Sequence, residues 1–97
     1  MDFVPKEQFL YALYKLSEKK SQWDKDQLII QLWKWFNGVL TLRSIEYKLY
    51  RMKIQGFISE VNNYFTRNPF FKDSRKKIVS INRAKILHYL KVNGLKP

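Results

Sequence analysis

Residues 40–58 decide the fold, and they read LTLRSIEYKLYRMKIQGFI. Thr41 is of a type that caps helices, because its hydroxyl oxygen can accept a hydrogen bond from a backbone amide of the first turn. Apolar side chains then recur at four- and three-residue spacing on one helical face, at Ile45, Leu49 and Met52. Gly56 can end the helix, and apolar residues follow it directly. The stretch therefore predicts a helix over about residues 42–55 that runs into a strand.

The opposite face of this helix carries polar and cationic side chains. Glu46 is the only acidic residue between Thr41 and Ser59, whereas an ordinary solvated face usually carries more acids. Every side chain on this face can hydrogen-bond to a phosphate or to the edge of a base. Together with the capping residue, the candidate contact residues are Thr41, Arg43, Ser44, Tyr47, Lys48 and Arg51.

After the glycine the apolar period changes to two, which is typical of a strand. A second stretch, residues 73–90, reads DSRKKIVSINRAKILHYL and predicts a basic turn, a return strand and a helix over about residues 83–92. The hairpin would span about residues 57–81, with a connection longer than the usual 2 to 5 residues. Its aromatic side chains would pack back on the body of the domain, which is slightly favoured over stacking on bases.

Two further helices are predicted before residue 40. Pro5 suits the first position of a helix over about residues 5–18, because that position needs no amide donor. The polar run over residues 17–22 ends this helix. Its apolar face is Phe9, Leu10, Leu13, Tyr14 and Leu16.

Asp24 and Gln27 form a capping-box pattern for the second helix, over about residues 25–36. Asn37 and Gly38 would form its left-handed C-terminal cap. Trp33 and Trp35 cannot both face the core, since they are two positions apart on a helix. The predicted core face is Leu28, Leu32, Trp35 and Phe36, with Ile29 and Trp33 on the flank. The fold class is therefore mainly α with a small β-hairpin, an α+β domain.

The positive charge is concentrated in one part of the chain. The net charge is +11, but residues 1–40 hold six lysines and five acids, a net of +1, while residues 41–97 hold thirteen lysines or arginines and three acids, a net of +10. Charge that served only solubility would have no reason to segregate. A polyanion partner is favoured over a merely solvated basic surface.

The sequence lacks the residues that enzymes, metalloproteins and cofactor-binding proteins usually need. The chain has no cysteine, and its single histidine, His88, lies among apolar residues of the last helix. No glycine-rich phosphate loop, catalytic triad or carboxylate cluster is present. We therefore expect no enzyme, no metal and no cofactor. Without a membrane-spanning run or a signal-peptide pattern, we expect a soluble cytoplasmic protein, nucleoid-associated or encoded by a virus or plasmid.

The predicted order of a basic helix over about residues 42–55, a hairpin and a helix over about residues 83–92 resembles the MarR and SarA group of winged helix-turn-helix proteins. In that group the first of these helices contacts the bases and is called the reading helix here. The resemblance covers about residues 3–90 and includes the Gly56-Phe57-Ile58 run and an Asp-x-Arg element at Asp73-Ser74-Arg75. It implies that Arg75 is the wing-tip arginine at the minor groove and that Asp73 orients it. The implied wing contacts with DNA are Arg67, Lys72, Asp73, Arg75, Lys76 and Lys77.

This chain would be a minimal form of that group, because the long first helix is missing and the last helix is short. The familiar dimer interface and its effector pocket are therefore not expected, and no small-molecule effector is inferred. A homodimer through the first or last helix is favoured, since one half-site alone would bind weakly.

The leading expectation is a sequence-selective regulator of transcription that binds double-stranded DNA. Its reading helix would lie in the major groove, and its basic wing would lie on the adjacent groove. A non-specific architectural protein and a winged-helix module for protein or RNA interaction are the alternatives.

Overall fold

The computed structural model describes residues 4–63 and 76–94, and these form four helices and a three-stranded antiparallel sheet. In chain order the elements are α1 (Lys6–Lys19), β1 (Gln22–Asp24), α2 (Lys25–Trp35), α3 (Leu42–Ile54), β2 (Ile58–Asn63), β3 (Lys76–Ile81) and α4 (Arg83–Val92). Each helix begins and ends within one residue of its position predicted from the sequence. The described part of the chain is thus an α+β domain.

The helices begin and end where the sequence places its caps. The Asp24 side chain accepts from the Asp26 amide at 3.0 Å at the start of α2. The Thr41 hydroxyl accepts from the Ser44 amide at 3.1 Å at the start of α3. Asn37 takes a positive φ of 53° after α2, as the predicted left-handed cap requires.

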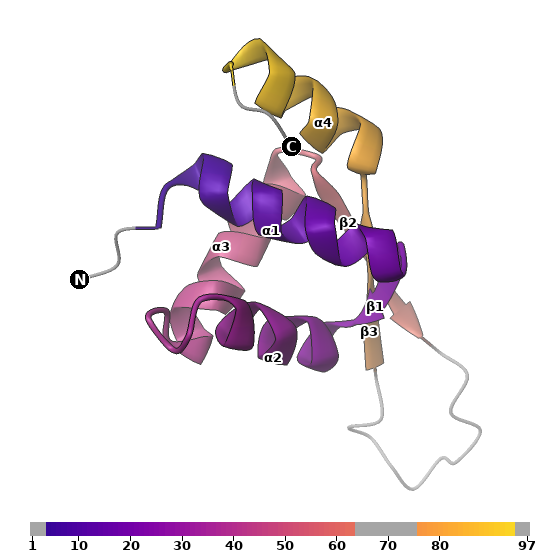
Figure 1. Ribbon diagram of the computed structural model, residues 1–97. Helices are drawn as coiled ribbons and strands as arrows, with labels where there is room; N and C mark the ends of the chain where they lie inside the picture. Colours follow the sequence, from indigo (N-terminus) through magenta and orange to yellow (C-terminus); the bar gives the residue numbers. More distant parts are fainter. Residues whose placement is uncertain (1–3, 64–75, 95–97) are drawn as a thin grey trace, which may run out of the picture.

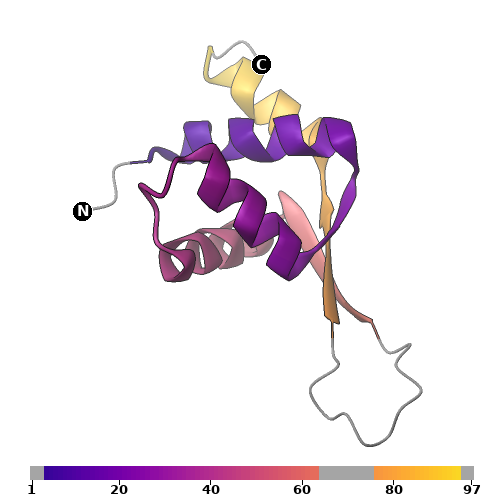
Figure 2. The same ribbon diagram turned by 60° about the horizontal axis from the view of Figure 1, so that its bottom comes forward.

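The sheet has the order β1-β3-β2, so the last strand in sequence is the central one. Ile58 pairs with Ile81, and Val79 pairs with both Glu60 and Trp23. These five residues share one face of the sheet because side chains alternate along each strand. Figures 1 and 2 show α1, α2 and α3 on one side of the sheet, with β2 and β3 extending beyond the helices as a hairpin.

The core fills the space between the helices and the sheet. Phe57 is buried just before β2, and its ring meets that of Tyr89 edge-on at 5.4 Å between centroids, which joins the hairpin to α4. α4 packs against α1. The largest fully buried side chains are Phe9, Leu10, Leu13, Leu28, Leu32, Leu40, Ile45, Leu49, Val79, Ile86 and Leu90.

Strand β1 was not predicted, because Gln22 was assigned to the polar run that ends the first helix and Asp24 to the cap of the second helix. Three residues are too few for an alternating pattern, and only Trp23 among them is buried. The strand exists because β3 offers it an unpaired edge.

The prediction that Trp35 belongs to the core face of α2 is wrong, since 42% of its surface is exposed. The side of α2 that faces the core is instead formed by Leu28, Ile29 and Leu32. Of these, Ile29 was expected only on the flank. The Trp35 ring lies edge-on to Tyr11 of α1, with 6.4 Å between the ring centroids. In the described residues no helix is long and apolar enough to cross a membrane.

Candidate nucleic-acid interface

One face of α3 points away from the core. Ile45, Leu49 and Met52 are buried, so the residues on the opposite side of the helix are exposed. Arg43, Tyr47 and Arg51 are four residues apart and form one stripe there. Three of the six helix residues predicted as contacts thus form an outward-facing stripe of two cations and a phenol.

The other three predicted residues lie elsewhere. The Thr41 hydroxyl oxygen caps its own helix. Ser44 and Lys48 are half-buried, on the side of α3 that turns toward α1. Lys48 Nζ donates to the backbone oxygen of Val4 at 3.3 Å, so this lysine ties α3 to the chain just before α1.

The sequence interpretation missed two residues of the exposed face. Tyr50 and Ile54 are 55% and 63% exposed, and together with Tyr47, 62% exposed, they add an apolar strip beside the arginines. The signal was present, because Tyr47, Tyr50 and Ile54 follow three- and four-residue spacing opposite the core stripe. An apolar strip of this kind suits contact with bases, whose edges include the thymine methyl group.

The wing residues are only partly described. Arg67, Lys72, Asp73 and Arg75 lie outside the described residues. Lys76 is the first residue of β3, where it is in register with Asn63 of β2. Lys77 follows it, and its Nζ lies 3.6 Å from Glu60 Oε1, with the side chain 49% exposed.

Glu60 is the centre of a cluster of lysines that the sequence did not reveal. Its carboxylate, on β2, accepts a hydrogen bond from Lys25 Nζ at 3.1 Å, and Lys53 Nζ lies 3.5 Å from it. Burial alone would raise the pKa of Glu60, but the hydrogen bond from Lys25 and the charges of Lys25, Lys53 and Lys77 hold that pKa below its ordinary value. Three ammonium groups around one carboxylate leave the junction of α2, α3 and the hairpin cationic.

The two flanks of α3 differ in charge. Beside α2, the flank borders a hollow of about 280 Å³ whose lining includes two carboxylates and three apolar residues: Asp26, Ile29, Ile30, Leu42 and Glu46. Beside α1, the flank borders a second hollow that is lined by three cations and no acid. The hollow beside α1 therefore favours a polyanion more than the hollow beside α2 does.

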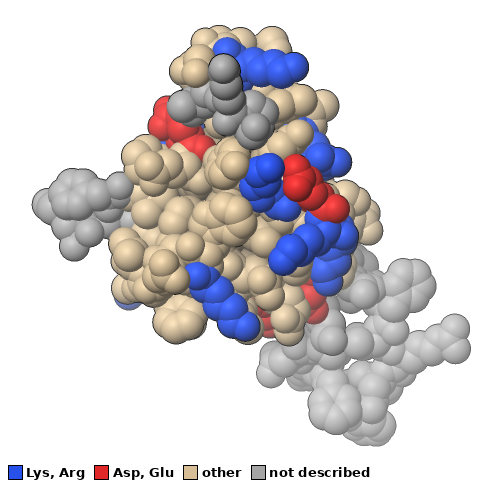
Figure 3. Space-filling view, viewed as in Figure 1, with Lys and Arg blue, Asp and Glu red and all other residues tan. Residues whose placement is uncertain are grey.

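The face formed by α1 and α2 is different again. Figure 3 shows a largely uncharged area left of centre, with basic and acidic side chains together on the right and further basic side chains at the top and the lower edge. Trp35 of α2 is 42% exposed and lies against Tyr11 of α1, whereas Trp33, 44% exposed, lies on another side of α2, beside Gly38. His88 is exposed on α4, and no group of three metal-ligating side chains occurs within residues 4–63 and 76–94.

No protein-family model matches the chain, and no curated protein or solved structure matches it significantly. The resemblance to the MarR and SarA group accordingly stays a prediction.

Proposed function

We propose that this chain is a winged helix-turn-helix domain that binds double-stranded DNA sequence-selectively and regulates transcription. The observation that carries the proposal is the outward stripe of α3, where Arg43, Tyr47 and Arg51 project from a capped helix. The element order and the sheet order β1-β3-β2 are compatible with such a domain. The major groove, about 12 Å wide, admits one α-helix.

Each residue of the stripe has a role in this proposal. Arg43 and Arg51 donate to guanine edges or to phosphates, because a guanidinium can bind either one through two parallel hydrogen bonds. Tyr50 and Ile54 contact thymine methyl groups. The hairpin formed by β2 and β3 lies along the adjacent groove, and Arg75 with its partner Asp73 stays a prediction for the wing tip.

The test compares matched charge removals in a fluorescence anisotropy titration. Arg43→Gln is expected to weaken binding to a duplex recovered by selection by about 1–3 kcal/mol and to weaken binding to a scrambled duplex less. Lys34→Gln, on the exposed surface of α2, removes the same charge and serves as the control. Equal losses on both duplexes from Arg43→Gln would reject base reading by this face.

A partner-binding role for the α1–α2 face is a second candidate, and Trp35, which is 42% exposed beside Tyr11 of α1, favours it. We propose a second copy of the chain as that partner, since two copies could read two half-sites. Light scattering should then give a dimer mass, and Trp35→Ser should shift it toward the monomer. A monomer at high concentration with unchanged tryptophan emission would reject this candidate.

A further inference from the structure

The hollow on the α1 flank of α3 has the composition of an anion site. Its volume is about 230 Å³, below the range of about 300–1,000 Å³ common for drug-sized ligands. A single small group fits this size better than an organic ligand does. The lining residues are Lys6, Phe9, Tyr47, Lys48, Arg51, Met52 and Gln55.

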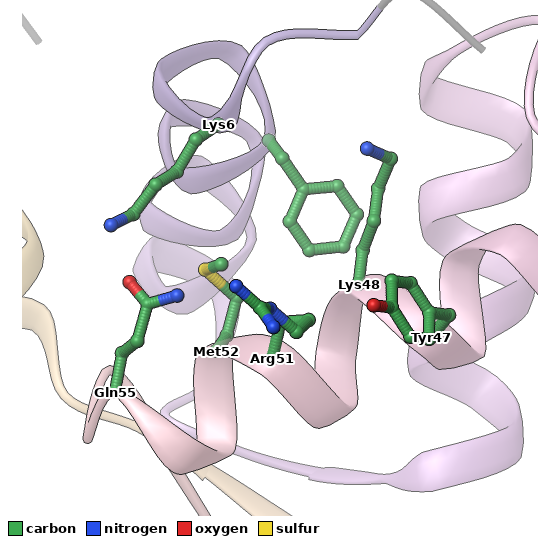
Figure 4. Close-up of a pocket in the computed structure, with 7 residues that line it drawn as sticks. Lys6, Tyr47, Lys48, Arg51, Met52 and Gln55 are labelled. Atoms are coloured by element: carbon green, nitrogen blue, oxygen red, sulfur yellow. The ribbon is translucent and has the colours of Figure 1, made fainter.

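Two elements bring the polar groups together. Figure 4 shows Lys6 on α1 and Lys48, Arg51 and Gln55 on α3, with side chains from both helices bordering the same space. Phe9 and Met52 are 1% and 5% exposed and give the hollow an apolar floor. Water is thereby excluded from one side, so that the cations act more strongly on a bound charge than they would in open solvent.

Most of the surroundings add to the positive potential, although Glu7 accepts a hydrogen bond from the Tyr89 hydroxyl at 3.3 Å nearby. Lys6 is the first residue of α1, whose N-cap, Pro5, supplies no side-chain hydrogen bond, so the positive end of the helix lies beside the hollow. Lys6 Nζ lies 4.6 Å from the centroid of the Tyr89 ring, which holds the ammonium in place. The backbone oxygen of Gln55, which would repel an anion, accepts a hydrogen bond from Lys85 Nζ.

We infer that this hollow binds one phosphate group, with the Lys6 ammonium and the Arg51 guanidinium as its ligands. Arg51 can donate two parallel hydrogen bonds to phosphate oxygens, and Lys6 adds a point charge. The phosphate can come from a duplex backbone beside α3, a reading that rests on the proposed function, or from a free phosphorylated molecule.

The salt dependence of duplex binding tests whether the bound phosphate belongs to a duplex backbone. Removing one phosphate contact should lower the slope of log K against log salt by about one, which makes the loss of affinity between 50 and 200 mM salt smaller by roughly threefold. Lys6→Gln should show this change and Lys6→Arg should not. Lys19→Gln removes the same charge at the far end of α1 and should leave the slope unchanged.

A titration with inorganic phosphate, at constant ionic strength set with chloride, tests whether the hollow binds a free phosphate group. The amide resonances of Lys6, Arg51 and Gln55 should shift in two-dimensional NMR spectra and should not shift in Lys6→Gln. Gln55→Glu places a carboxylate in the hollow and should abolish the shifts as well, which keeps the test valid if Lys6→Gln folds poorly.

The outcomes separate this inference from the proposed function. A changed salt slope identifies a backbone phosphate, and phosphate-induced shifts without a changed slope identify a free one. Phosphate-induced shifts in a protein that binds no duplex at low salt would reject the proposed function but keep the site. An unchanged slope together with no shifts at Lys6, Arg51 or Gln55 would overturn the inference.

Discussion

Replacing Glu60 by glutamine should weaken the fold and strengthen duplex binding at the same time. The carboxylate joins three elements, because it contacts Lys25 of α2, Lys53 of α3 and Lys77 of β3. Glutamine keeps the shape of the side chain and one acceptor oxygen, but it removes the negative charge. The three ammonium groups then lose their counter-charge and become available to phosphates.

The contacts set the size of the stability loss. The hydrogen bond from Lys25 joins two charged groups, and such bonds contribute about 1.5–3 kcal/mol. The Lys53 and Lys77 side chains are 46% and 49% exposed, so solvent screens their pairs to at most about 1 kcal/mol each. Because glutamine can still accept from Lys25, we expect Glu60→Gln to lower the free energy of unfolding by about 1–2 kcal/mol. That loss lowers Tm by roughly 5–15 °C.

The stability loss caused by Glu60→Gln should depend on pH. The folded-state pKa of Glu60 lies below 4.5, so the carboxylate stabilises the fold fully above about pH 4.5. This contribution disappears as the pH falls through the folded pKa. The Tm difference between the wild-type protein and Glu60→Gln should therefore be largest near neutral pH and should shrink toward pH 3.

Thermal unfolding monitored by circular dichroism between pH 3 and 7 measures both effects. Glu46→Gln is the matched control, since it removes an exposed acid of α3 and should leave Tm nearly unchanged. In anisotropy titrations at low salt, Glu60→Gln should bind duplex DNA more tightly than the wild-type protein. Equal Tm values for both variants across the pH range would refute the reasoning about the lysine cluster.

Two other substitutions test the backbone around α3. Gly56→Ala should cost about 1–2 kcal/mol because Gly56 has a φ of +84°, which a residue with a Cβ adopts only with strain; the flexible Lys85 side chain beside it can move aside. Urea unfolding measures this loss, and an unchanged midpoint would contradict it. Thr41→Ala should lose about 1 kcal/mol through the missing cap, whereas Thr41→Ser should keep most of that stability. The same urea midpoints distinguish these two variants, and equal midpoints would show that the cap contributes nothing.

The helices of this protein were predictable because their signals are local. Thr41 and Asp24 lie directly at helix starts, and the apolar residues of α3 recur within one turn of each other. Strand β1 was not predictable, because it depends on the edge of β3, more than fifty residues away. Trp35 was misplaced because helical spacing does not say which of two adjacent apolar strips meets the core.

The candidate site was predictable only in part, because some of its residues come together through contacts between elements that are distant in sequence. Arg43, Tyr47 and Arg51 follow from the face of one helix. The lysines around Glu60 and the hollow between Lys6 and Arg51 come from elements that are distant in sequence. Long-range contacts of this kind depend on the crossing of α1 over α3 and on the register of the hairpin, which no local pattern contains.

Selection from a pool of random duplexes tests the central claim most directly. The purified protein is incubated with the pool and excess competitor DNA, and the bound fraction is recovered and sequenced. The account predicts an enriched motif, and a palindromic motif would indicate that two copies bind together. Binding without any enrichment would contradict sequence-selective reading by α3 and would favour a protein that coats DNA without selecting sequence.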